Sequence, residues 1–121
     1  MKILVCRPDG RPTIEDLEGD LLSFLYETID PAIDHNTALR PGRSLGGVSM
    51  WCDDWFLAKD LAPNWGASAI WRLCRGPGAM PMPLRGVIVY SGMNQEGDSV
   101  DIPEQFVNLL VTNSINVEGW S

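Results

Sequence analysis

Tryptophan and arginine side chains gather in the middle of the chain, among aspartate and asparagine residues. Indole rings stack on flat ligands and anchor protein interfaces, and guanidinium groups hold phosphates or carboxylates through paired hydrogen bonds. Asparagine and aspartate can read a base edge or a ribose. These are the parts of a nucleotide-sized pocket and equally of a protein interface. The candidate binding residues are Trp51, Asp53, Trp55, Asn64, Trp65, Trp71, Arg72 and Arg85.

The same tryptophans have a second interpretation, because two or three of them can simply fill the core of a short chain. If they are buried and scattered, the predicted site is lost. If two or more line one concave surface with Arg72 or Arg85, a ligand or partner site is indicated.

The motifs of common catalytic sites do not occur in the sequence. A catalytic triad would have to use His35, the single histidine, but no serine lies in a nucleophile-elbow motif. Neither a P-loop nor a dinucleotide-binding glycine motif occurs. The neighbouring residues Asp53 and Asp54 leave a hydrolase open as a lesser alternative. We therefore lean towards a protein that is not an enzyme and uses no cofactor.

Three cysteines, Cys6, Cys52 and Cys74, stand too far apart in the sequence to form a zinc motif. We expect no metal site, and we expect reduced, mostly buried thiols in a cytoplasmic protein, that of the host cell if a phage encodes the chain. The start of the chain shows no secretory signal, and the apolar runs fall short of the ~20 residues that cross a bilayer. No membrane association is expected.

The net charge of −7 is divided unevenly along the chain. Residues 40–85 carry +3, whereas the segments on either side carry −5 each. A binder of bulk nucleic acid needs an extended basic surface, so this class is excluded. The positive middle suits one small anionic ligand or an acidic patch on a partner protein.

Periodicity predicts the elements that position these residues. Residues 2–7 form an apolar strand that ends at the turn Pro8-Asp9-Gly10, and residues 14–29 have helical spacing with Thr13 as the cap. Residues 32–34 suggest a brief strand. Pro41 and three glycines then indicate a loop over 40–47 that carries Arg40 and Arg43.

In the second half, residues 48–53 alternate, with Val48, Met50 and Cys52 facing the core and Trp51 facing out. A structured loop over 54–65 leads to a helix over 66–75 that Asn64 or Ser68 caps. Residues 85–91 predict the clearest strand, and Asp101 is expected to cap a final helix.

This order predicts an α+β fold, with two or three helices packed on a small mixed β-sheet. A chain of 121 residues should form a single domain over 1–121, in which 112–121 is a candidate loose tail.

Several short motifs carry a resemblance to a known family. They are the opening strand with its turn at 8–10, the segments 51–54 and 57–64, and the strand 85–92 that closes on Gly92. Together they resemble an uncharacterised small-domain family common in phages, plasmids and actinobacterial chromosomes. The family pattern has Gly-Leu-Pro-Pro-Asn where this chain has residues 60–64, and the loops at 40–47 and 76–83 look longer than usual. The resemblance implies the fold and a mobile-element origin, without an activity.

Two functions follow as hypotheses. The first is a phage or mobile-element accessory protein that binds a host protein and inhibits a host process or antiviral defence. The second is a sponge for a small anionic ligand, a nucleotide or signal nucleotide held by the tryptophans and arginines. Assembly into a homo-oligomer stays open.

Overall fold

The computed structural model describes residues 1–29, 39–44, 47–53, 60–75 and 83–119. The chain opens with a hairpin in which β1 (Lys2–Cys6) pairs antiparallel with β2 (Thr13–Asp16). The predicted turn after β1 forms, because Gly10 N donates a hydrogen bond to Arg7 O at 3.2 Å. The expected opening strand is therefore confirmed.

The central strand of the sheet is β5 (Ile88–Met93), with β1 on one side and β4 (Val48–Asp53) on the other. The edges are β2 and β3 (Leu39–Ser44), and the short β6 (Ser99–Val100) pairs with the end of β5. The α+β class is confirmed. Every pairing between these strands is antiparallel, which corrects the expected mixed sheet.

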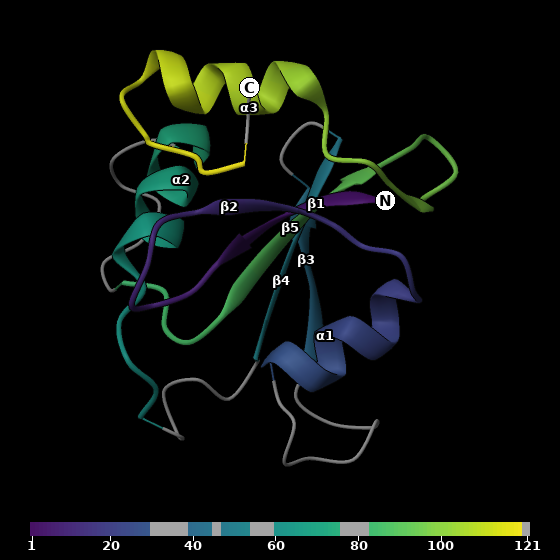
Figure 1. Ribbon diagram of the computed structural model, residues 1–121, viewed down its shortest axis with the longest axis horizontal. Helices are drawn as coiled ribbons and strands as arrows, with labels where there is room; N and C mark the ends of the chain where they lie inside the picture. Colours follow the sequence, from purple (N-terminus) through teal and green to yellow (C-terminus); the bar gives the residue numbers. More distant parts are fainter. Residues whose placement is uncertain (30–38, 45–46, 54–59, 76–82, 120–121) are drawn as a thin grey trace.

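Helices cover both faces of the sheet (Figure 1). One face packs against α2 (Trp65–Arg75) and α3 (Glu104–Thr112), and the other against α1 (Leu21–Ile29). Strand residues alternate between the two cores, so that Leu4 and Cys6 belong to the first and Ile3 and Val5 to the second. The inner strands β1, β4 and β5 therefore present side chains to both layers.

The helix expected over 14–29 is shorter than predicted, since it begins at Leu21. Residues 13–16 form β2 instead, because the tight turn brings them beside β1 and strand pairing satisfies their backbone groups. The cap is Asp20, whose Oδ2 accepts hydrogen bonds from the backbone N and the Oγ of Ser23, both at 3.0 Å.

The loop expected over 40–47 is also corrected, because β3 continues to Ser44. Its pairing with β4 shifts register between Pro41 and Ser44, which accommodates a proline at a sheet edge. The brief strand expected at 32–34 lies outside the described residues. The strand predicted over 48–53 forms as β4. The strand predicted over 85–91 also forms, but as β5 it begins and ends later, at Ile88 and Met93.

The cap of α3 and the chain end differ from expectation. Pro103 occupies the N-cap position, whereas the Asp101 carboxylate accepts a hydrogen bond from Lys2 N at 3.1 Å. The segment expected as a loose tail is held in place as far as residue 119. The backbone of Glu118 accepts a hydrogen bond from Ile14 N at 2.8 Å and donates one to Pro12 O at 2.9 Å. Ile115 and Val117 pack against the first core.

Candidate functional site

The exposed face of α2 carries two of the predicted site residues. Trp65 is 67% exposed in the first turn, and Ala69 and Arg72 are exposed further along the helix. At 100° per residue these three positions lie within about 60° of one another around the helix axis, and Trp65 and Arg72 are about 10 Å apart along it. We call these three residues the α2 face.

Asn64 holds the base of this helix in place. Its Oδ1 accepts a hydrogen bond from Ala67 N at 3.0 Å, which caps α2 as the sequence predicts. Its Nδ2 donates to Cys6 O and Gly86 O, both at 2.8 Å. The side chain is buried, so Asn64 positions the α2 face without being available to a partner.

The opposite side of α2 belongs to the core. Ala67, Ile70 and Trp71 are buried there, and the Tyr90 hydroxyl donates a hydrogen bond to Ala67 O at 3.1 Å. Burial raises the pKa of Tyr90, and the nearby thiols of three cysteines raise it further. Trp71 is therefore a core residue on the side of the helix that faces the sheet.

Trp51 and Asp53 lie on the other face of the sheet. Trp51 packs against the second core, on the α1 side of the sheet. Its indole Nε1 donates a hydrogen bond to Ser91 Oγ at 3.0 Å. Asp53 is buried at the end of β4. Val48, Met50 and Cys52 face the first core, as predicted. Trp51 does not face open solvent, because it is half-buried beside the helix on its own side.

Arg85 is held against the segment before α2. Its guanidinium Nη1 donates to Leu61 O at 3.0 Å and lies 3.9 Å from Asp60 Oδ1. The side chain is one-quarter exposed, and the contact with the exposed Asp60 carboxylate is long. Trp55, the remaining predicted residue, lies outside the described residues.

The structure thus brings Trp65 and Arg72 together and separates them from Trp51, which lies across the sheet. The predicted constellation does not form one pocket within the described part of the chain. The loop expected over 54–65 ends one residue early, because α2 begins at Trp65. Sequence reasoning missed Ala69, since positions four and seven residues after Trp65 lie on one helix face only when Trp65 belongs to the helix.

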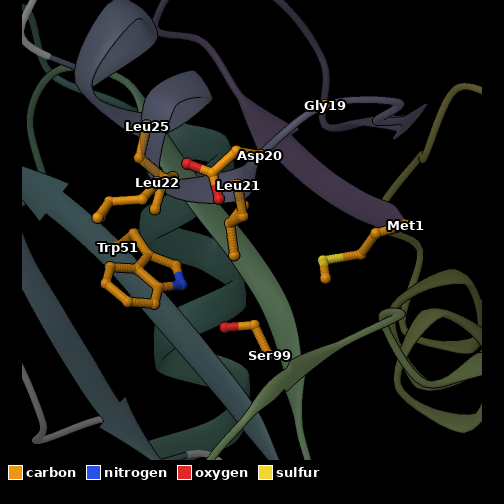
Figure 2. Close-up of a pocket in the computed structure, with 8 residues that line it drawn as sticks. All are labelled: Met1, Gly19, Asp20, Leu21, Leu22, Leu25, Trp51 and Ser99. Carbon is orange, nitrogen blue, oxygen red and sulfur yellow. The ribbon is translucent and has the colours of Figure 1, made fainter.

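A cavity beside Trp51 was not predicted. It has a volume of about 380 Å³ and lies between α1, the start of β1 and β6. Its lining comes from segments far apart in the sequence, so no local motif marks it. Its lining residues are Met1, Gly19, Asp20, Leu21, Leu22, Leu25, Trp51 and Ser99 (Figure 2).

Within residues 1–29, 39–44, 47–53, 60–75 and 83–119, no group of three acidic, histidine or cysteine side chains is arranged to hold a metal ion. The three cysteines form no disulfide with one another, and burial raises the pKa of Cys6 far above its ordinary value. None of the described helices is long and apolar enough to cross a membrane.

Comparison with known proteins adds no relative: no family model matches the chain, and neither the curated proteins nor the solved structures contain a match.

Proposed function

We propose that this protein is a binding protein that engages another protein through the α2 face. The observation that carries the proposal is the 67% exposure of Trp65 on a helix that also presents Arg72. When a partner covers a large indole surface that was exposed to water, the free energy of the system falls, which favours binding. Tryptophan and arginine are also the residue types most enriched among interface hot spots.

The shape of the α2 face favours a protein over a nucleotide. Small ligands bind in concave sites that bury most of their surface, whereas the exposed side of a helix is convex. Trp65 and Arg72 stand about two turns apart, a separation suited to neighbouring contacts on a broad partner surface. An apolar pocket for the indole and an acidic group for Arg72 would complement this face.

The surroundings of α2 add a second positive group. The Cα of Gly66 lies against the Pro12 ring, since a Cβ built there would be 3.4 Å from the ring carbons. The exposed Arg11 precedes Pro12 and therefore lies near the first turn of α2. We infer that the partner surface is acidic around an apolar centre, because α2 presents Arg72 and Arg11 lies near its first turn.

The resemblance to a mobile-element family would make this partner a host protein and would give the binding an inhibitory purpose. A cytoplasmic setting accords with the three free cysteines, because thiols stay reduced there.

The test is quantitative capture from a lysate of the native host with immobilised protein. Wild type is compared with Trp65→Ala, Arg72→Ala and the control Leu109→Ala, which changes an exposed residue of α3. We expect a protein that wild type and Leu109→Ala retain equally. Once that protein is purified, Trp65→Ala should weaken its binding about 30-fold, as for a hot-spot residue.

Two outcomes would contradict the proposal. One is a captured protein whose binding is indifferent to both Trp65→Ala and Arg72→Ala. The other is a nucleotide that, at millimolar concentration, raises the melting temperature of wild type but not of Trp65→Ala. The second result would favour the nucleotide sponge.

A further inference from the structure

The cavity beside Trp51 is separate from the α2 face, because it lies on the α1 side of the sheet. Figure 2 shows the side chains of Met1, Leu21, Trp51 and Ser99 directed toward a common space. The hydrogen bond from Trp51 Nε1 to Ser91 Oγ holds the indole in this orientation. A volume of about 380 Å³ is within the range of small-molecule sites.

Most of the cavity wall is apolar. Leu21, Leu22 and Leu25 come from two turns of α1, and the Met1 thioether and the Trp51 ring complete the wall. Leu22 is 48% exposed at its rim, so part of this apolar surface meets water. An apolar ring or chain that enters the cavity would cover it.

The charge around the cavity is negative. Asp20 is a lining residue, and its Oδ2 caps α1. Within the described part of the chain, its Oδ1 accepts no hydrogen bond. The exposed carboxylate of Glu18 lies two residues away. Among the residues that the structure describes, the lining contains no lysine, arginine or histidine.

Two positive groups that the structure describes near the cavity do not reverse this sign. The Met1 ammonium lies 3.4 Å from Asp16 Oδ1 and donates a hydrogen bond to Leu17 O at 2.9 Å, so its charge is compensated. Lys2 follows Met1 but points to the opposite face of the sheet, because side chains alternate along β1 and Ile3 faces α1.

We propose that this cavity binds a small hydrophobic amine, with its apolar ring or chain among the α1 leucines and its ammonium group beside Asp20. The Trp51 ring adds a surface that attracts cations through its π electrons. A carboxylate or phosphate ligand would instead meet the Asp20 charge without a cationic partner in the lining.

The test uses three probes of similar size: phenethylamine, 2-phenylethanol and 3-phenylpropionate. Each is titrated to about 10 mM while backbone amide and indole NMR signals are followed. We expect phenethylamine to shift the signals of Leu21, Leu22, Ser99 and the Trp51 indole, with binding tighter than that of the alcohol. The anionic probe should bind most weakly.

A matched pair of variants tests the role of the charge. Asp20→Asn removes the carboxylate but keeps a good helix cap, and Glu27→Gln removes an exposed carboxylate of the same helix outside the lining. Asp20→Asn should weaken phenethylamine binding about threefold or more and leave the alcohol unaffected. Glu27→Gln should change neither.

The proposal is overturned if phenethylamine shifts no lining signal, or if 3-phenylpropionate binds as tightly as the amine. Equal effects of Asp20→Asn and Glu27→Gln would also overturn it, since the charge would then act only at long range. If Asp20→Asn does not fold, the ranking of the three probes on wild type decides the matter.

Discussion

Trp65 and Arg72 lie two turns apart on the same side of α2, and both side chains are exposed. Trp71, the neighbour of Arg72 in the sequence, is only 6% exposed on the opposite side of the helix. One helix therefore uses one tryptophan to join the core and presents the other to solvent. Substitutions of the two tryptophans can therefore distinguish a contribution to stability from a contribution to the proposed binding.

Trp65→Ala should change the free energy of unfolding by no more than about 0.5 kcal/mol, because an exposed side chain contributes little to folding. Trp71→Ala should cost about 3–5 kcal/mol, because it leaves a large cavity between α2 and the sheet. Urea denaturation of both variants provides the comparison. A large loss of stability in Trp65→Ala would show that its indole packs internally and would weaken the proposed interface.

Asn64→Ala should destabilise the fold by about 3 kcal/mol. The change removes the cap of α2 and leaves the carbonyls of Cys6 and Gly86 without the donor they share. Asn64→Asp keeps an acceptor for the cap but cannot donate to either carbonyl, so it should be at least as harmful. Thermal and urea unfolding measure both variants, and a cost below about 1 kcal/mol for Asn64→Ala would contradict the role assigned here.

Gly92→Ala should disrupt the contact between β5 and the residues after β6. A Cβ at position 92 would collide with Asp101 O, a backbone atom that cannot move aside without shifting the segment after β6. We expect a loss of about 2 kcal/mol or more. Gly10→Ala is the control, because a Cβ there meets no atom within 4 Å. Equal stability of the two variants would refute the close approach.

Stability at alkaline pH should depend on Tyr90. Burial raises its pKa, so the folded protein keeps the hydroxyl proton to a higher pH than the unfolded chain does. This contribution is complete below the unfolded pKa of about 10 and is lost as pH rises beyond it.

The comparison variant is Tyr90→Phe. Near pH 7 it should be about 1 kcal/mol less stable than wild type, because it loses the hydrogen bond to Ala67 O. Between pH 7 and about pH 11 it should lose less stability than wild type does. Urea unfolding at both pH values tests this, and parallel losses in the two proteins would show that Tyr90 does not titrate with unfolding.

Much of the fold was accessible from the sequence where the signal is local. The alternation over 48–53 predicts which residues of β4 face the first core, and Asn64 before a run of small residues predicts the cap of α2. The segment 13–16 was misassigned because its apolar spacing fits a helix, whereas its pairing with β1 depends on the preceding turn. Pairing between strands is a tertiary property that overrides local periodicity.

The candidate site was less accessible for the same reason. Composition gathers the tryptophans into one segment of sequence, but β4 and α2 place Trp51 and Trp71 on opposite faces of the sheet. The cavity beside Trp51 includes Met1 and Ser99, which only the folded sheet brings near α1. Trp65 and Arg72 share one helix face because α2 begins at Trp65, one residue before the helix that the sequence predicts over 66–75.

Site-specific photo-cross-linking tests the central claim most directly. Benzoylphenylalanine is placed at position 65, at position 69 or, as a control, at position 109 on α3, and each protein is irradiated in the cells that naturally produce it. The proposed interface predicts one common cross-linked partner from positions 65 and 69 and none of that partner from position 109. Cross-linking of the same protein from all three positions, or from position 109 alone, would contradict binding through the α2 face.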